Sequence, residues 1–520
     1  MKLSVDLWLY ILALVPLEDA VACTLVSREF RVLAEEKTFW LHLLETIRKY
    51  QPLPCPDDEK IEERDVSGLK HLALHTIRRE RNWSSEVDVA TIKKVETFEL
   101  GAGHSIIHSI PGTPYLVVHS EHDGTVTWWN LVDRLKGDIV YVGRSVFHVS
   151  LALCHKDAHS FALLVTDEFA ADYFNRPLIL VVLTFQRAPN SNPRMDISFK
   201  RSLQTWFTYG QLFLNAHIVG FLRVFDTETL DIIAYNLTSG ACRVIHTDKL
   251  YDRKMGTYID HALYIVRDRS KTSSNVHICP AHLLPYFDSE EKETHVADPL
   301  HWDDHGIRFW GHMDSTFSGL ETWFEALGAV ATPPVRGAAL CTIHHINIDD
   351  EPLPTAINIR LWTYRERTNG GISPSRRLYP VYRLNLAGWL SYVVSTSRHY
   401  HLIDCSDVSI LLMVEFHGRR SLRLVRYDPS KDCSSIHQLA SPPSLDLTTV
   451  TGIALDDHRA TVVLIDRVGA FIHMSSSSRR LSFGAVLTRT PYMGGMLANA
   501  GPLRSKAPNA EISFENHYTW

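Results

Sequence analysis

The sequence has few cysteines, and they are far apart. Its 520 residues contain eight, and no two lie within five positions of each other. A structural zinc site needs closely spaced ligand pairs, so this spacing argues against one. Eight cysteines are also too sparse for a disulfide scaffold, and most of them stand beside apolar residues. The pattern predicts buried, reduced thiols and a cytoplasmic or nuclear protein.

The chain also lacks a long apolar run and an excess of positive charge. Its apolar stretches, such as Leu7–Val15 and Leu178–Leu183, are shorter than the ~18 residues that would cross a bilayer. It has 53 Lys and Arg against 59 Asp and Glu, a net charge of −6. Binding to nucleic acid depends on clustered basic residues. We therefore expect neither a membrane nor a nucleic acid as partner.

The common catalytic motifs are missing as well. The sequence has no G-x-S-x-G, no H-E-x-x-H and no P-loop. Two pairs of histidines are close in sequence, but strand periodicity would place the members of each pair on opposite faces; they are His119 with His122 and His344 with His345. Paired aspartates such as Asp456 and Asp457 fit turns between strands better than a glycosidase site. The sequence predicts no enzyme, and no catalytic residue, cofactor or metal.

The first 22 residues allow two interpretations. A basic start, the apolar run of residues 7–15 and an A-x-A pattern at residues 20–22 are typical of a secretory signal. Asn82 and Asn236 also have the spacing of glycosylation acceptors. If this segment were removed, the protein would be a secreted β-propeller, a lectin or a hydrolase. Three acidic residues before the apolar run and before the cleavage site argue against removal: Asp6, Glu18 and Asp19.

The same segment also has the periodicity of helices. Five apolar residues fall on one helical stripe: Leu3, Leu7, Ile11, Leu14 and Val15. Pro16 ends that helix, a second one follows, and Ser27 can cap a third helix over residues 28–36. Four apolar residues then close the bundle: Phe39, Trp40, Leu43 and Leu44. Three short helices make a small core, so we expect this bundle to complete its core against a partner.

These residues resemble an F-box over residues 1–45. The resemblance rests on five segments: Leu3-Ser4-Val5-Asp6, Ile11-Leu12, Val15-Pro16-Leu17-Glu18-Asp19, Leu25-Val26-Ser27-Arg28-Glu29-Phe30 and Phe39-Trp40. The sequence departs from the family pattern at Ser4, where proline is usual, and at Phe30, where tryptophan is frequent. The first departure weakens the opening contact, and the second keeps an aromatic ring.

The resemblance implies a function. An F-box binds the adaptor subunit of a cullin–RING (SCF-type) ubiquitin ligase, and the rest of the chain then selects a protein substrate. The implied adaptor-binding residues are Leu3, Val5, Leu7, Ile11, Leu12, Val15, Pro16, Leu17, Leu25 and Val26. An apolar helical face of this kind is suited to burial in a partner groove. The alternative is that these residues pack only against the C-terminal domain.

Residues 46–95 read as a linker with one helix. A polar, proline-rich loop over residues 51–66 precedes a helix from Gly68 to Trp83. That helix contains Arg78, Arg79 and Arg81, which we interpret as a solvated charged face.

From residue 96 the sequence predicts a large all-β domain. Runs of β-branched and aromatic residues alternate with Gly, Asn and Asp turns. The segment Asp123–Leu131 resembles a strand of a WD-type blade, with Asn130 in place of aspartate. The strand–turn–strand units recur every 40–60 residues, which favours a degenerate β-propeller over residues 96–520. An acidic, aromatic segment over residues 286–335 is an insert or an elaborated blade. We expect the tail after Gly501 to pair with the first strand if the ring closes.

Overall fold

The computed structural model describes most of residues 4–475. The residues outside the description are 1–3, 13, 49–50, 57–58, 84–88, 91–93, 152–157, 168–177, 188–191, 204–207, 225–229, 248–253, 260–261, 271–272, 280–283, 286–292, 301–306, 311–319, 333–334, 347–357, 364–378, 386–399, 406–408, 417–418, 429–432, 441–444 and 476–520.

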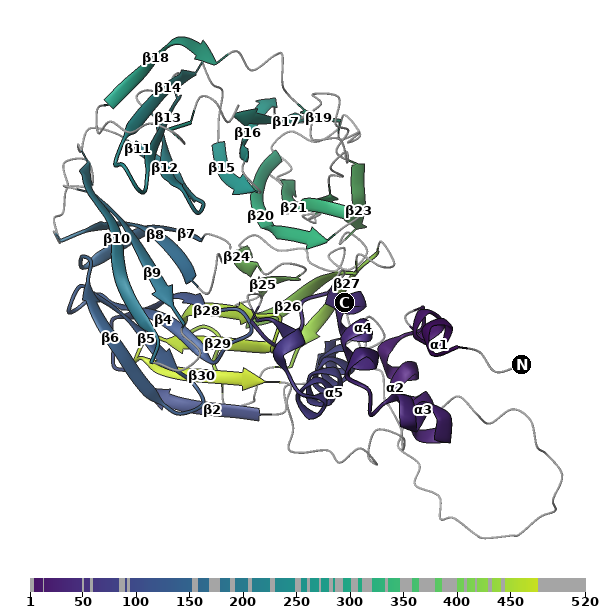
Figure 1. Cartoon of the computed structure of the whole chain (residues 1–520). Helices are drawn as coiled ribbons and strands as arrows, with labels where there is room; N and C mark the ends of the chain where they lie inside the picture. Colours follow the sequence, from purple (N-terminus) through teal and green to yellow (C-terminus); the bar gives the residue numbers. More distant parts are fainter. Residues whose placement is uncertain are drawn as a thin grey trace, which may run out of the picture. The chain divides into compact units, whose positions relative to one another are not determined.

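The chain begins with helices and continues in strands (Figure 1). The helices are α1 (Val5–Leu12), α2 (Leu17–Val26), α3 (Arg28–Leu33), α4 (Lys37–Arg48), the 3-10 turn η1 (Ile61–Glu63) and α5 (Val66–Trp83). Pro16 immediately precedes α2, and Ser27 separates α2 from α3. The Phe30 backbone N–H donates to the Ser27 hydroxyl at 3.5 Å, so the predicted cap is confirmed. The residues expected to close the bundle lie on α4, and the predicted boundary at residue 45 falls within that helix.

The interior of the helical region includes the helix from the predicted linker. Phe39, Trp40 and Leu44 on α4 are fully buried, and so are Leu69 on α5 and Ile61 on η1. The Trp40 indole N–H donates to the carbonyl of Ala34 at 2.7 Å, which satisfies its one polar atom. The loop and α5 therefore supply core that the sequence expected from a partner.

The charged face predicted on α5 is only partly solvated, and at Arg79 the prediction is wrong. Arg79 is fully buried; it donates to the Pro52 carbonyl and pairs with Glu80 at 2.8 Å. A buried guanidinium needs such acceptors to offset its lost hydration. Arg81 pairs with Glu18 on α2, its Nε lying 3.0 Å from the carboxylate. These contacts fix α5 against the loop and against α2.

Within the described residues, the strands form seven sheets in chain order. The first sheet contains β3 (His104–Ser109), β4 (Tyr115–Ser120), β5 (Thr125–Asn130) and β6 (Leu135–Tyr141), and the second contains β7 (Ser145–Leu151), β8 (Ala158–Thr166), β9 (Leu178–Gln186) and β10 (Arg194–Leu203). The third sheet contains β11 (Thr208–Leu214), β12 (Ile218–Val224), β13 (Leu230–Asn236), β14 (Cys242–Thr247) and β18 (Glu293–Leu300). The fourth sheet contains β15 (Lys254–Ile259), β16 (Ala262–Ser270), β17 (Ser273–Cys279) and β19 (Ile307–Trp310). The fifth sheet contains β20 (Leu320–Thr332), β21 (Val335–Ile346), β22 (Asn358–Thr363) and β23 (Tyr379–Asn385). The sixth sheet contains β24 (Tyr400–Cys405), β25 (Ser409–Phe416), β26 (Arg419–Asp428), β27 (Cys433–Leu439) and β1 (Val89–Ala90). The seventh sheet contains β28 (Val450–Asp456), β29 (Thr461–Asp466), β30 (Ala470–Ser475) and β2 (Lys94–Glu99).

Each sheet is largely an antiparallel meander, and neighbouring sheets are in contact in the order of the chain. Strand β11 contacts β7 and β15, β15 contacts β20, β20 contacts β24, and β24 contacts β28. Strand β28 in turn contacts β3 of the first sheet, so the order of contacts returns to its start. Repeated sheets of four or five strands in this order are the architecture of a β-propeller, which confirms the predicted all-β, propeller-like region after the helices (Figure 1).

The seventh sheet is completed by a strand from the beginning of the β region. Strand β2 pairs antiparallel with β30, with Thr97 opposite Ile472 and Phe98 opposite Phe471. The tail after Gly501, which the sequence predicts to pair with the first strand, lies outside the described residues. The pairing of β2 joins segments about 370 positions apart in the sequence, as the register shows.

The segment predicted as an insert contributes strands to three sheets. Strand β18 adds to the third sheet in parallel to β14, β19 ends the fourth sheet, and β20 begins the fifth. Trp302 lies outside the described residues, and the side chains of Trp310 and Trp323 are also undescribed.

Apolar side chains fill the space between neighbouring sheets. Val126 and Trp128 of β5 share a cluster with Phe161 of β8 and Phe185 of β9. Gly137 on β6 allows this packing, because a Cβ there would lie 1.7 Å from the ring of Trp128. Sequence alternation thus becomes a stacked core between the first two sheets.

Helix α5 is attached to the sixth sheet by a charged contact. Arg426 of β26 donates to both carboxylate oxygens of Glu80, at 3.2 and 3.3 Å, and to the carbonyl of Trp83 at 2.9 Å. The Trp83 ring belongs to the cluster of Leu422 and Leu424 from the same sheet. We call this set, Arg426 with Arg79, Glu80 and Trp83, the joint.

A second contact lies between the loop before α5 and the seventh sheet. His458 Nδ1 donates to the carbonyl of Leu53 at 2.9 Å, and the Cys55 carbonyl lies 3.1 Å away. Gly112, between β3 and β4, has a φ of +69°, and a Cβ there would lie 2.2 Å from the Cys55 carbonyl oxygen. Glycine is needed at this position both for its backbone conformation and for the close approach.

Candidate partner-binding surface on the helices

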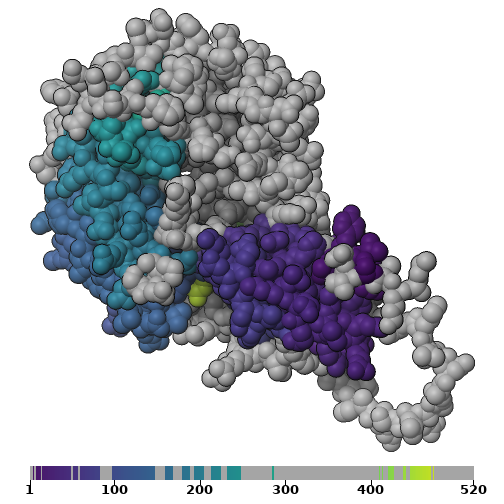
Figure 2. Space-filling view, in the orientation of Figure 1, coloured from purple at the N-terminus to yellow at the C-terminus, as the bar shows by residue number. Residues whose placement is uncertain are grey.

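The helices α1 to α3 and their connections leave an unusual amount of apolar surface uncovered. Seven large apolar side chains in this short segment are at least one third exposed: Leu7 (50%), Tyr10 (64%), Ile11 (38%), Leu14 (71%), Val15 (36%), Val26 (77%) and Val32 (64%). Isolated exposed apolar residues are ordinary, but a concentration of them marks an interaction site. We call these seven residues the helical apolar surface; the helices that carry it are purple in Figure 2.

The structure places the predicted adaptor-binding residues in three ways. Five are exposed: Leu7, Ile11, Val15, Pro16 and Val26. Leu17 and Leu25 are half-buried, while the side chains of Leu3 and Val5 lie outside the described residues. The side chain of Leu12 is only 3% exposed and belongs to the interior of the bundle. It follows Ile11 directly, and adjacent helical positions point about 100° apart.

Sequence reasoning left three exposed residues out of the site. Tyr10, Leu14 and Val32 belong to the helical apolar surface but were not named as adaptor-binding residues. Leu14 stands on the apolar stripe recognised in the sequence, so periodicity contained the signal for it. Tyr10 and Val32 carried no such signal, because an amphipathic pattern does not tell which apolar side chains the rest of the fold leaves uncovered.

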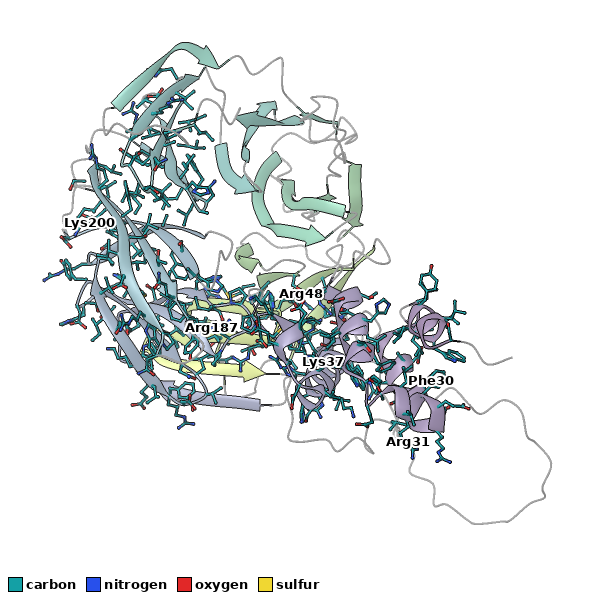
Figure 3. All side chains as sticks on the ribbon, viewed as in Figure 1. Phe30, Arg31, Lys37, Arg48, Arg187 and Lys200 are labelled. Carbon is teal, nitrogen blue, oxygen red and sulfur yellow. The ribbon has the colours of Figure 1, made fainter. Side chains whose placement is uncertain are left out.

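Side-chain contacts hold the small helices in place. The rings of Trp8 on α1 and Phe30 on α3 meet edge to face with centroids 4.8 Å apart. Arg31, the next residue on α3, donates from its guanidinium to the Leu25 carbonyl near the end of α2 at 3.1 Å. Figure 3 labels Phe30 and Arg31 on this helix. The aromatic ring at position 30 therefore has a structural role in fixing α1 against α3.

Helix α2 is also anchored to α5. Ala20 and Val21 are fully buried, and Glu18 binds the guanidinium of Arg81 on α5. The hydrogen bond to Glu18 raises the pKa of the Arg81 guanidinium. Helix α2, which carries Val26 of the helical apolar surface, is therefore fixed to α5.

The described residues offer little else for chemistry. No group of three or more His, Cys, Asp or Glu side chains among them is placed to share a metal ion. The three cysteines whose side chains are described, Cys23, Cys55 and Cys242, are not joined in disulfides. Asp456 and Asp457 are both buried, and burial raises the pKa of Asp456. Among the helices in the described ranges, none is long and apolar enough to cross a membrane.

Comparison with known proteins identifies the helical segment. Residues 1–42 match the family model of the F-box domain, so the chain carries an F-box there. No curated protein matches the sequence.

Solved structures similar to the chain include β-propellers. The Cps50 (Swd1) β-propeller domain of Myceliophteria thermophila is 11% identical with a TM-score of 0.38, and the match covers 74% of this chain and 99% of that one. The WD40 domain of SCAP from fission yeast is 8% identical with a TM-score of 0.33, covering 74% and 98%. An oligogalacturonate lyase in complex with manganese is 9% identical with a TM-score of 0.39, covering 74% and 96%. At these scores the assignment of the fold rests on the strand pairing described above.

Proposed function

We propose that this protein is a substrate-recognition subunit of an SCF-type cullin–RING ubiquitin ligase. The F-box binds the adaptor subunit, and through it the cullin, while the β domain binds a protein substrate. The chain itself performs no catalysis in this proposal. It raises the local concentration of the substrate at the ligase by holding both at once.

The observation that carries the proposal is the helical apolar surface within the F-box. The bundle already has its own core, completed by α5, and seven apolar side chains nevertheless remain exposed. Burying such a face in a groove of a partner lowers the free energy by roughly 25 cal/mol for each Å² of apolar surface removed from water. This argues for a protein partner and against the alternative that these residues pack only on the β domain.

The joint supports the second half of the proposal. A receptor must hold its substrate at a defined position relative to the adaptor, which requires a firm connection between the F-box and the β domain. Helix α5 supplies one, because it packs on α4 inside the helical region and binds Arg426 in the sixth sheet. An ion pair that also binds a backbone carbonyl restricts both distance and direction.

The rival function, a secreted β-propeller without residues 1–22, conflicts with two features. Removal of residues 1–22 would take Ala20 and Val21 out of the core and would leave Arg81 without Glu18. Asn236, one of the residues with glycosylation spacing, is 6% exposed, and its Nδ2 donates to the Pro285 carbonyl at 2.7 Å. The atom that would carry a glycan is therefore already bound in the interior.

Adaptor binding tests the proposal directly. The purified chain is titrated with the purified adaptor subunit, as wild type and as Leu7→Asp. We expect the substitution to weaken binding at least tenfold, because it places a carboxylate in an interface that must be dry. The matched control is Leu135→Asp on β6, a leucine that is 60% exposed but far from the F-box in sequence.

The control should bind like the wild type, and both variants should unfold at the wild-type temperature. If the wild type does not bind the adaptor, or if Leu7→Asp and Leu135→Asp bind equally well, the F-box does not act as proposed.

A further inference from the structure

A hollow lies where the seventh sheet meets the first. It is lined by Phe98 and Leu100 from β2 and its end, and by the β5–β6 segment with Trp129, Leu131 and Arg134, together with Asn130. The Asn130 amide is occupied within its own turn, since its Nδ2 donates to Asp133 and its Oδ1 accepts from the backbone of Val132. Apart from this amide and the guanidinium, the lining side chains are apolar.

Exposed apolar residues continue from the hollow onto its surroundings. Val132 and Leu135, on either side of Arg134 in the sequence, are 62% and 60% exposed. Val468 is 72% exposed and precedes Gly469, whose carbonyl accepts the Leu100 backbone N–H at 2.9 Å. Hollow and surroundings together form an apolar surface within the β domain, on elements that do not belong to the F-box.

Two cations stand over the aromatic rings of the hollow. The guanidinium carbon of Arg134 lies 4.9 Å from the centroid of Phe98, and Lys136 Nζ lies 5.9 Å from that of Trp129. Within the part of the chain that the structure describes, neither cation forms a salt bridge. Three acids lie nearby: Asp133 accepts from the neutral Asn130 amide and keeps its negative charge, Asp123 interacts electrostatically with Lys136, and Glu99 follows Phe98 on a strand and so faces the opposite side. The hollow therefore offers positive charge beside apolar surface.

The backbone of Arg134 strengthens this interpretation. Its φ is +58°, in the left-handed region where glycine is free of strain and a side chain is not. A turn of this kind would be easier to form with glycine. Strain at a non-glycine residue is tolerated where the side chain has a task, and the side chain here lines the hollow.

We propose that this hollow binds a short peptide segment of a protein partner in which an apolar side chain is flanked by carboxylates. The apolar side chain enters between Phe98, Trp129 and Leu131, and a carboxylate meets Arg134 and Lys136. Such a pairing combines burial with charge-assisted recognition. The identification of this partner as the ubiquitination substrate rests on the proposed function; the binding site itself does not.

A peptide array measures the preference of the site. The full-length chain is applied to seven-residue peptides with a central Leu, Val, Phe or Pro flanked by Glu, Ser or Lys, and the affinity of selected peptides is then measured by fluorescence anisotropy. We expect Glu-flanked peptides to bind at least tenfold more tightly than Lys-flanked ones. Equal binding of the three flanks, preference for Lys, or no binding at all would overturn the proposal.

Variants then place the binding at the hollow. Arg134→Gly removes the cation and relieves the backbone, so it should weaken the Glu-flanked peptide at least fivefold without lowering the unfolding temperature. Arg201→Ala is the control, because the Arg201 guanidinium carbon lies 5.9 Å from the centroid of the Tyr235 ring and does not line the hollow. Figure 3 labels the preceding residue, Lys200. Unchanged binding by Arg134→Gly, or an equal loss with Arg201→Ala, would contradict the assignment.

Two further measurements are made. The first distinguishes peptide binding at the hollow from adaptor binding at the F-box, and the second distinguishes a peptide ligand from a nucleic acid. Leu7→Asp should bind the peptide like the wild type, so loss of adaptor binding and loss of peptide binding report independently on the two proposals. A fluorescent single-stranded oligothymidylate serves as a probe for nucleic acid, since aromatic rings with nearby cations also suit bases. Displacement of the Glu-flanked peptide by this probe at lower concentration than by unlabelled peptide would overturn the protein-partner assignment.

Discussion

Helix α5 is buried on two sides by two different kinds of interaction. Toward α4 it packs with apolar side chains; Leu69 on α5 is fully buried, as are Phe39 and Trp40 on α4. Toward the sixth sheet it makes the joint, where Glu80 is held by two guanidiniums. Apolar packing depends on volume and tolerates changes of pH, whereas a buried ion pair depends on both partners and on their charge. The F-box core and its connection to the β domain should therefore fail under different conditions.

The largest effect is expected in the apolar core. Trp40→Ala removes a fully buried indole and the hydrogen bond to the Ala34 carbonyl. We expect the free energy of unfolding to fall by about 3–5 kcal/mol, because the surrounding helices cannot collapse into the space. Urea denaturation followed by circular dichroism at 222 nm, where the helices dominate, measures this loss; a loss below ~1 kcal/mol would show that the core is not packed as described.

Loss of one partner in the joint comes next. Arg426→Leu leaves Glu80 with Arg79 as its remaining cation and frees the Trp83 carbonyl. We expect a destabilisation of about 3 kcal/mol, at the lower end of the range for a broken buried pair, because Arg79 still compensates part of the charge. A double-mutant cycle with Glu80→Gln separates the pair from each residue's other contacts. Additive effects of the two substitutions would mean that no coupling exists across the joint.

Acid should weaken the joint side of α5 and spare the apolar side. Burial and the nearby charges of Arg79 and Arg459 lower the pKa of His75 to about 4. Burial alone would raise the pKa of Glu80, but Arg426 and Arg79 outweigh it and lower this pKa to about 2. Because both pKa values lie below those of the unfolded chain, unfolded protein takes up protons first, and stability falls as the pH falls.

The two groups act in successive pH windows, His75 in the upper one and Glu80 in the lower one. Protonation of His75 lowers the free energy of unfolding as the pH falls from about 6.5 to 4, and protonation of Glu80 lowers it as the pH falls from about 4.5 to 2. Urea midpoints measured from pH 7.5 to 3.5 should decline, and His75→Gln should flatten the upper part of this decline while Trp40→Ala shifts the curve without changing its slope. A His75→Gln curve parallel to the wild type would contradict the assignment.

The smallest expected effect is at the connection between α2 and α3. Ser27→Ala removes the hydroxyl that accepts the Phe30 N–H. Loss of an N-cap costs about 1 kcal/mol, and the 3.5 Å distance places this one below that value. Thermal unfolding measures it, with Ser27→Asp as a variant that should keep the cap. Equal unfolding temperatures for the alanine and aspartate variants would show that the cap contributes nothing.

Local features of the helices could be predicted well from the sequence. Pro16 and Ser27 act through the residues next to them, so their effect on helix ends was visible without the fold. Leu7 and Ile11 stand on the apolar stripe that the sequence shows, and both are exposed in the structure. Leu12 faces another way than the adjacent Ile11, and only the packed bundle shows which of the two directions is covered.

The connections between distant segments could not be predicted. Arg79 reads as a surface charge in any local pattern, and its burial depends on the carbonyl of Pro52 and on Glu80. The hollow joins β2 to the β5–β6 turn, which are separated in sequence and meet because β2 pairs with β30.

The sequence by itself therefore determined the order of the parts: an F-box, a helix, and a β region with blade-like periodicity. It could do so because caps, helical stripes and strand alternation are short-range consequences of side-chain chemistry. Only the tertiary structure decided which strand completes the seventh sheet, which apolar residues of the F-box stay exposed, and which arginines are buried. Each of these depends on contacts between residues far apart in the chain, and burial is a property of such contacts rather than of any single segment.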